Sequence, residues 1–229
     1  MATAAPAAGG KTTSRKSPSA PQPDGGGLGA WFKVKTNRYL AAGIAVLAIG
    51  LVAWFVVMSG KRKEEFAARA LDQARGAAEA GNLPLAASEL QKVISTFSGT
   101  KAAQEAVITL NQVRLVNGQG ELAAVGLQDF LKSNPDREFL SPTYGLLGRA
   151  YENANRPADA AAAYENASKS ADLDYLKADF LLDAGRAYVS AGQKDKAIAA
   201  YQAILKDYPK TSSFVEAQVR LAELTEGKM

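Results

Sequence analysis

The chain has 229 residues, 47% of them hydrophobic, which is enough for one domain with a substantial core and additional segments. It contains no cysteine, which excludes disulfides, thiolate zinc sites and a lipidated N-terminal cysteine, and no histidine, which removes the usual general base and the commonest metal ligand. The net charge of +4 lies in the first 38 residues, where six basic residues face only Asp24, so the rest of the chain has no basic excess for nucleic acid.

Residues 1–38 are predicted to form a disordered basic tail. They are rich in Ala, Gly, Pro, Ser and Thr and include four prolines, so they cannot bury enough apolar surface to offset the entropy of ordering. The segment "APAAGGKT" at 5–12 loosely fits a phosphate loop, but no strand precedes it and no helix pattern follows. We therefore predict no nucleotide site in the tail.

Residues 39–59 are predicted to form a transmembrane anchor helix. The stretch "YLAAGIAVLAIGLVAWFVVM" at 39–58 has 20 residues without a charge. At about 1.5 Å per residue it reaches roughly 30 Å, the thickness of a bilayer core. Ten of its residues are Leu, Ile, Val or Phe, and together they favour insertion by about 3 to 6 kcal/mol.

Two other interpretations of this stretch fit the sequence less well. A buried core helix would have a polar face, and this stretch has none. A cleaved signal peptide would have a shorter apolar run, a short preceding region and a small-residue cleavage site, whereas 38 residues precede this run and "SGKRKEE" follows it. An uncleaved anchor fits the pattern better.

Residues 60–229 are predicted to form a helical repeat domain with a period of 37 residues. Two similar stretches mark the first and the last copy: "AGNLPLAASELQKVISTFS" and "AGQKDKAIAAYQAILKDYP". One column of the repeat is always alanine: Ala86, Ala123, Ala160 and Ala197. Five residues earlier stand residues that tolerate a left-handed backbone: Gly81, Gly118, Asn155 and Gly192. Four residues after each alanine stand large side chains: Leu90, Leu127, Tyr164 and Tyr201.

Each copy therefore predicts a helical hairpin. The left-handed residue ends the first helix in a tight turn, the alanine allows the two helices to approach closely, and the large side chain fills the space between them. After Pro209 one more first-helix pattern follows without a partner, which is typical of a capping helix.

This pattern resembles the tetratricopeptide repeat (TPR) family over about 165 of the 229 residues. The last copy carries the signature spacing most fully: Leu181, Gly185, Tyr188, Ala197, Tyr201, Ile204 and Pro209. The first two copies depart in their first helices, where Ala70, Ala74 and Ala77 replace large residues, and Asn111 and Arg114 replace a small and an aromatic residue. The resemblance implies an all-α chain: a disordered tail, one transmembrane helix, and a right-handed solenoid of four hairpins with a C-terminal capping helix.

One column is a candidate binding site. The position eleven residues before each alanine reads Arg75, Gln112, Arg149 and Arg186. In the TPR family this part of the first helix faces the concave groove, and arginine forks suit the carboxylates of a partner protein. The alternative is that each arginine supports its own helix, in pairs such as Asp72–Arg75 and Asp183–Arg186.

Composition and resemblance together predict a scaffold and not an enzyme. Without His or Cys, a catalytic site would need paired carboxylates or a Ser–Lys pair, and the acidic residues are scattered on helix faces. We predict no catalytic residue, metal or cofactor, and a protein or peptide as the partner.

A basic tail, one anchor and four TPR hairpins look like the bacterial ancillary subunit of the SecYEG translocon. That resemblance implies a single-pass inner-membrane protein with a cytoplasmic N-terminus and a periplasmic repeat domain that contacts SecYEG and periplasmic chaperones. The alternatives are a cell-envelope assembly or cell-division coordinator TPR protein, or a docking receptor that faces the cytosol. Local charge favours the last orientation, because Lys61, Arg62 and Lys63 follow the anchor.

Overall fold

The structure is a computed structural model that describes residues 35–225. Over this range it has nine helices and no strand, which confirms the all-α class. The helices are α2 (Lys35–Glu79), α3 (Leu83–Thr96), α4 (Lys101–Val116), α5 (Gly120–Lys132), α6 (Arg137–Asn153), α7 (Pro157–Ser170), α8 (Asp174–Ser190), α9 (Lys194–Asp207) and α10 (Ser213–Thr225).

The chain divides into two units between Val56 and Val57. The first unit contains the N-terminal part of α2, where large apolar residues such as Ile49 and Phe55 are exposed. Among the described residues, α2 is the one helix long and apolar enough to cross a membrane, with a mean hydropathy of 2.6 in its apolar window and none of that window buried.

The predicted tail at 1–38 falls mostly outside the described residues. The exception is its last four residues, which belong to α2, because this helix begins at Lys35. The predicted boundary between the anchor at 39–59 and the repeat domain from 60 is not a break in the helix, since α2 continues to Glu79. No Pro stands between Met58 and Glu79 to end it, and the helix accommodates Gly60 and Gly76.

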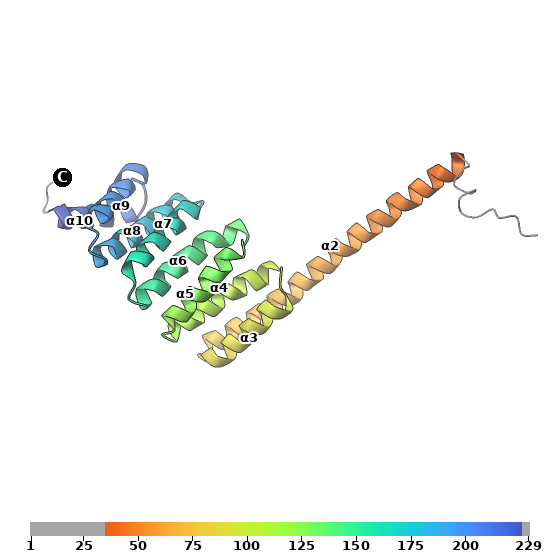
Figure 1. Ribbon diagram of the computed structural model, residues 1–229, viewed down its shortest axis with the longest axis horizontal. Coiled ribbons are helices and arrows are strands. Elements are labelled where there is room, and N and C mark those ends of the chain that lie inside the picture. The colour runs from red at the N-terminus through yellow and green to blue at the C-terminus, as the bar shows by residue number, and fades with distance from the viewer. Residues whose placement is uncertain (1–34, 226–229) are drawn as a thin grey trace, which may run out of the picture. The chain divides into compact units, whose positions relative to one another are not determined.

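The second unit is the TPR-like solenoid of four hairpins and a capping helix. The end of α2 shares a buried cluster with α3. The pairs α4–α5, α6–α7 and α8–α9 follow in chain order (Figure 1). The last helix, α10, packs on α8 and α9, as predicted for a capping helix. All four predicted left-handed positions have positive φ, including the non-glycine Asn155 at 56°.

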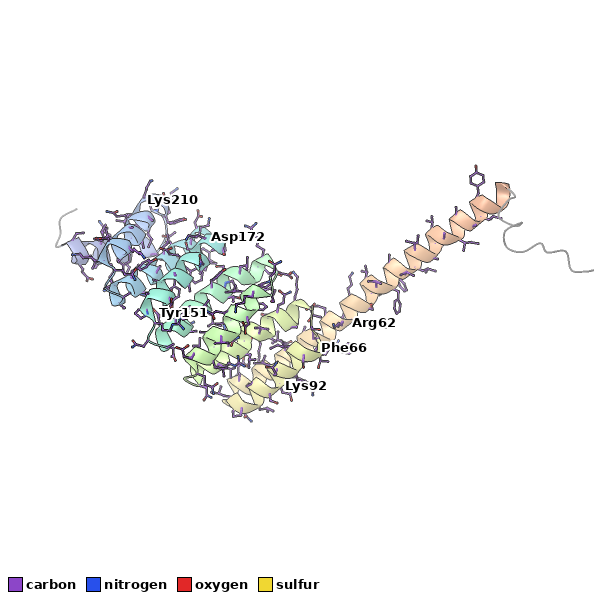
Figure 2. The ribbon with its side chains drawn as sticks, in the orientation of Figure 1. Arg62, Phe66, Lys92, Tyr151, Asp172 and Lys210 are labelled. Atoms are coloured by element: carbon purple, nitrogen blue, oxygen red, sulfur yellow. The ribbon has the colours of Figure 1, made fainter. Side chains whose placement is uncertain are left out.

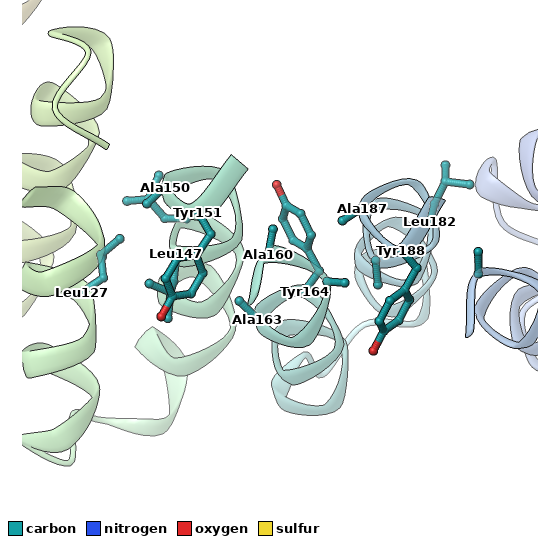
Figure 3. Packing of buried hydrophobic residues seen from close by; sticks show 14 of the residues in the cluster. Leu127, Leu147, Ala150, Tyr151, Ala160, Ala163, Tyr164, Leu182, Ala187 and Tyr188 are labelled. Atoms are coloured by element: carbon teal, nitrogen blue, oxygen red, sulfur yellow. The ribbon is translucent and has the colours of Figure 1, made fainter. Parts of the chain in front are cut away.

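The columns of the repeat form the core. All four alanines of the column at Ala86 are fully buried, and so are the large residues that follow them. Figure 3 shows Tyr164 between the helices of the third hairpin, with its hydroxyl on one side of the core and those of Tyr151 and Tyr188 on the other. The buried residues form two clusters, one from α2 to α4 and one from α4 to α10, so both cores meet at α4.

In the third and fourth hairpins a glycine of the first helix faces the tyrosine of the second. A methyl group added at Gly148 would lie 2.5 Å from Cε1 of Tyr164, and one at Gly185 would overlap the ring of Tyr201. No side chain fits there, because atoms at these separations repel strongly. The tyrosine ring is therefore accommodated only because the opposite position has no side chain.

In the second hairpin the large side chain is on the first helix and the glycine is on the second. Asn111 takes the glycine position, is almost fully buried, and donates from Nδ2 to the carbonyl oxygen of Val107 at 2.8 Å. The space comes from Gly126 on α5, where an added Cβ would lie 2.6 Å from Oδ1 of Asn111. Arg114, at the aromatic position, donates to the same Oδ1 at 3.0 Å. The departure of this copy from the family pattern is thus compensated within the hairpin.

We expect Ala197→Trp to lower the free energy of unfolding by about 1–3 kcal/mol or more, because the fully buried Ala197 has no room for a larger side chain. Ala199→Trp is the matched control, since Ala199 is exposed on the same helix. Chemical denaturation of both variants measures the difference. Equal stability of the two variants would contradict the close approach of α8 and α9.

Candidate functional site: the first-helix groove

Three hollows lie between consecutive first helices, and together we call them the first-helix groove. The first, of about 330 Å³, is lined from α4 and α6 by residues that include Leu115, Arg149 and Glu152. The second, of about 290 Å³, which we call the central hollow, is lined by residues that include Gln112, Arg149 and Asp183. The third, of about 230 Å³, lies at α8 and α10 and includes Arg186 and Arg220. Arg149 therefore lies between two of the hollows.

The structure places the four predicted site residues in different surroundings. Gln112 and Arg149 line the same hollow, and Arg186 lines the next one. Arg75 is instead occupied by an ion pair across hairpins, with Nη2 2.6 Å from Oε1 of Glu105. The predicted Asp72–Arg75 pair is therefore wrong, because Arg75 reaches the next hairpin and not back along its own helix.

The Arg75–Glu105 pair joins residues 30 positions apart, and the repeat transfers this relation to later hairpins. The equivalent of Arg75–Glu105 at the end of the solenoid is Arg186–Glu216, where the closest atoms are 3.8 Å apart. Arg186 also pairs with Asp183 on its own helix, as predicted. Partly exposed pairs of this kind contribute only about 0–1 kcal/mol each. Two of the three arginines thus serve in part as supports between or within helices.

Arg149 is the exception to this pattern. Its equivalent partner is Asp179, but the carboxylate of Asp179 accepts a hydrogen bond from the hydroxyl of Ser213. Among residues 35–225, Arg149 has no ion pair and no side-chain hydrogen bond. Its exposed guanidinium group is therefore free to bind an external carboxylate.

The acidic groups near Arg149 are held by other residues. Oε2 of Glu152 accepts a hydrogen bond of 2.8 Å from the hydroxyl of Tyr164, and burial together with this bond raises the pKa of Tyr164, so the hydroxyl stays protonated. Burial raises the pKa of Asp183; the nearby Arg186 and, more weakly, Arg149 oppose this shift, and Glu152 adds to it. The groove is therefore mixed in charge, and Arg149 is its unpaired cation.

The sequence prediction missed the acidic partners and Phe180. The positions seven residues before Gln112, Arg149 and Arg186 lie two helical turns away on the same face. They hold Glu105, Pro142 and Asp179, of which the first and the last are acidic. That spacing could have indicated the cross-hairpin pairs. The half-buried Phe180, which lines the central hollow, has no equivalent in the other copies and could not be found from the repeat.

Comparison with known proteins agrees with the fold. Residues 146–211 match the model of the tetratricopeptide repeat family, and no curated protein matches the chain. A crystal structure of the MamA protein has 24% sequence identity and a TM-score of 0.56, covering 72% of this chain and 83% of that chain. A second structure of MamA has 24% identity and a TM-score of 0.54, covering 68% and 84%. At this identity the likeness concerns the fold alone.

Proposed function

We propose that the chain is a membrane-anchored scaffold that holds a partner protein in the first-helix groove. The observation that carries the proposal is the unpaired Arg149 between two hollows, in a column whose other arginines are held by carboxylates. An unpaired cation beside a hollow attracts acidic segments of a partner, and this attraction weakens as the salt concentration rises. Support for a protein partner also comes from the solenoid fold, which offers an extended surface built from equivalent positions.

The membrane role rests on the apolar part of α2. Its exposed apolar side chains need a hydrocarbon environment. Charged residues stand only outside the apolar stretch, at Lys35 and Arg38 before it and from Lys61 and Arg62 onward after it, where Figure 2 labels Arg62. We propose one membrane span with the N-terminus in the bacterial cytoplasm and the solenoid in the periplasm. We propose SecYEG and periplasmic chaperones as partners, from the resemblance to the ancillary translocon subunit; an envelope-assembly or cell-division role is the alternative.

Binding through Arg149 is tested by photocrosslinking. A photoreactive amino acid at Gln112, on the wall of the same hollow, should crosslink a partner in isolated membranes. We expect Arg149→Ala to lower the crosslink yield several-fold and to change stability by less than about 0.5 kcal/mol, because the exposed guanidinium group makes no ion pair or hydrogen bond among residues 35–225 and interacts with Asp183 only at longer range. Arg75→Ala is the matched control, since it removes an arginine of the same column that is already paired.

A normal crosslink yield in Arg149→Ala, or an equal loss in Arg75→Ala, would place the binding surface elsewhere. The mass of the crosslinked products separates the candidate partners. Translocon subunits or periplasmic chaperones would support the first assignment, and division or envelope-assembly proteins the alternative.

The orientation can be measured with cysteine labelling, because the natural chain has no cysteine. Ala199→Cys places a thiol at an exposed position of α9. We expect a membrane-impermeant maleimide to label this thiol in intact spheroplasts. Labelling only after lysis would contradict the periplasmic orientation and favour a docking receptor that faces the cytosol.

A further inference from the structure

A further hollow, outside the three of the first-helix groove, adjoins the central hollow and is mainly apolar. It has a volume of about 370 Å³ and lies between the N-terminal parts of α6 and α8, with a wall that includes Pro142, Leu173, Leu176 and Phe180. Pro142 and Phe180 also line the central hollow, which holds Arg149. The two hollows are therefore neighbours that share these two residues, and together we call them the slot, with an apolar end and a cationic end.

The wall between the two ends depends on Gly145. A Cβ at this position would lie 2.5 Å from Cε1 of Phe180, so the ring can rest against α6 only because position 145 has no side chain. At the rim of the apolar end, both carboxylates form ion pairs with basic residues of this chain. Oε1 of Glu138 is 2.6 Å from Nζ of Lys101, and Oδ1 of Asp172 is 2.8 Å from Nη2 of Arg137.

The length of the slot gives the spacing of its ligand. Pro142 and Arg149 are seven residues apart on α6, which corresponds to about 10 Å at about 1.5 Å per residue. An extended peptide advances about 3.4 Å per residue. A side chain in the apolar end and a carboxylate at Arg149 are thus about three residues apart on a ligand in the extended conformation.

We infer that the slot binds an extended segment of a partner protein that carries a large apolar side chain and, three residues away, an aspartate or glutamate. The apolar side chain enters the hollow beside Phe180 and Leu173, and the carboxylate pairs with Arg149. Asp183 also lines the central hollow, but its ion pair with Arg186 offsets its repulsion of the ligand. This inference rests on the proposed function and specifies the chemistry of the partner at that site.

The test uses the full-length protein in detergent and fluorescein-labelled peptides of eight residues, measured by fluorescence anisotropy. The parent peptides carry Phe and Glu three residues apart, in both orders, in a Gly/Ser background. The comparison peptides replace Phe by Ser, replace Glu by Gln, or place Glu directly beside Phe. We expect one parent order to bind at least about five-fold more tightly than each of its comparison peptides.

Two protein variants assign the ends of the slot. Leu173→Ser should remove the preference for Phe and keep the preference for Glu, and it should preserve folding because Leu173 is half exposed and serine is favoured at this N-cap position of α8. Arg149→Ala should remove the preference for Glu and keep the preference for Phe. Leu122→Ser on α5 is the matched control, with a similar exposure and a position outside both hollows.

The inference is overturned if no peptide binds, if all peptides bind alike, or if the parent peptide keeps both preferences in the two variants. The failure of this inference can be told apart from the failure of the proposed function. If crosslinking from Gln112 still depends on Arg149 while the peptides show no preference for the three-residue spacing, the partner uses the groove but not the slot.

Discussion

The solenoid depends on one steric constraint, which is the close approach of the two helices in each hairpin. An alanine of the second helix is fully buried at the contact, and a large side chain one turn later fills the remaining space. In the third and fourth hairpins that large side chain is a tyrosine, and it needs a glycine opposite. Once this contact is fixed, the first helices of successive hairpins occupy equivalent positions, and their exposed residues line one groove.

Repetition explains the ion pairs along the groove and makes the departure at Arg149 visible. The ion pairs Arg75–Glu105 and Arg186–Glu216 join residues in equivalent positions of neighbouring hairpins. At Arg149 the corresponding carboxylate, on Asp179, binds Ser213 instead. Of the four positions in the column, two keep the ion pair, and Gln112 opposite Pro142 carries no charge. Arg149 is the position where the cation is present without its pair, and it lies where two hollows meet.

Much of the fold could be predicted from the sequence because the period is constant. Positions such as Asn155 and Ala160 have the backbone conformation and the burial that their columns require, and both follow from local rules. The exchange of sizes between Asn111 and Gly126 could not be predicted, because it depends on which side chains face each other across a hairpin. For the same reason the column of arginines was found, but the partner of Arg75 was not. The slot beside Phe180 lies outside the repeat pattern altogether.

A double-mutant cycle on Gly148 and Tyr164 tests the steric constraint most directly. Gly148→Ala alone should destabilise the protein, because the new methyl group meets the tyrosine ring. In the Tyr164→Leu background, which reproduces the alanine and leucine pair found at Ala74 and Leu90 of the first hairpin, the same change should cost much less. The account predicts a coupling of about 1 kcal/mol or more between the two changes in chemical denaturation. Additive effects, within about 0.5 kcal/mol, would contradict it.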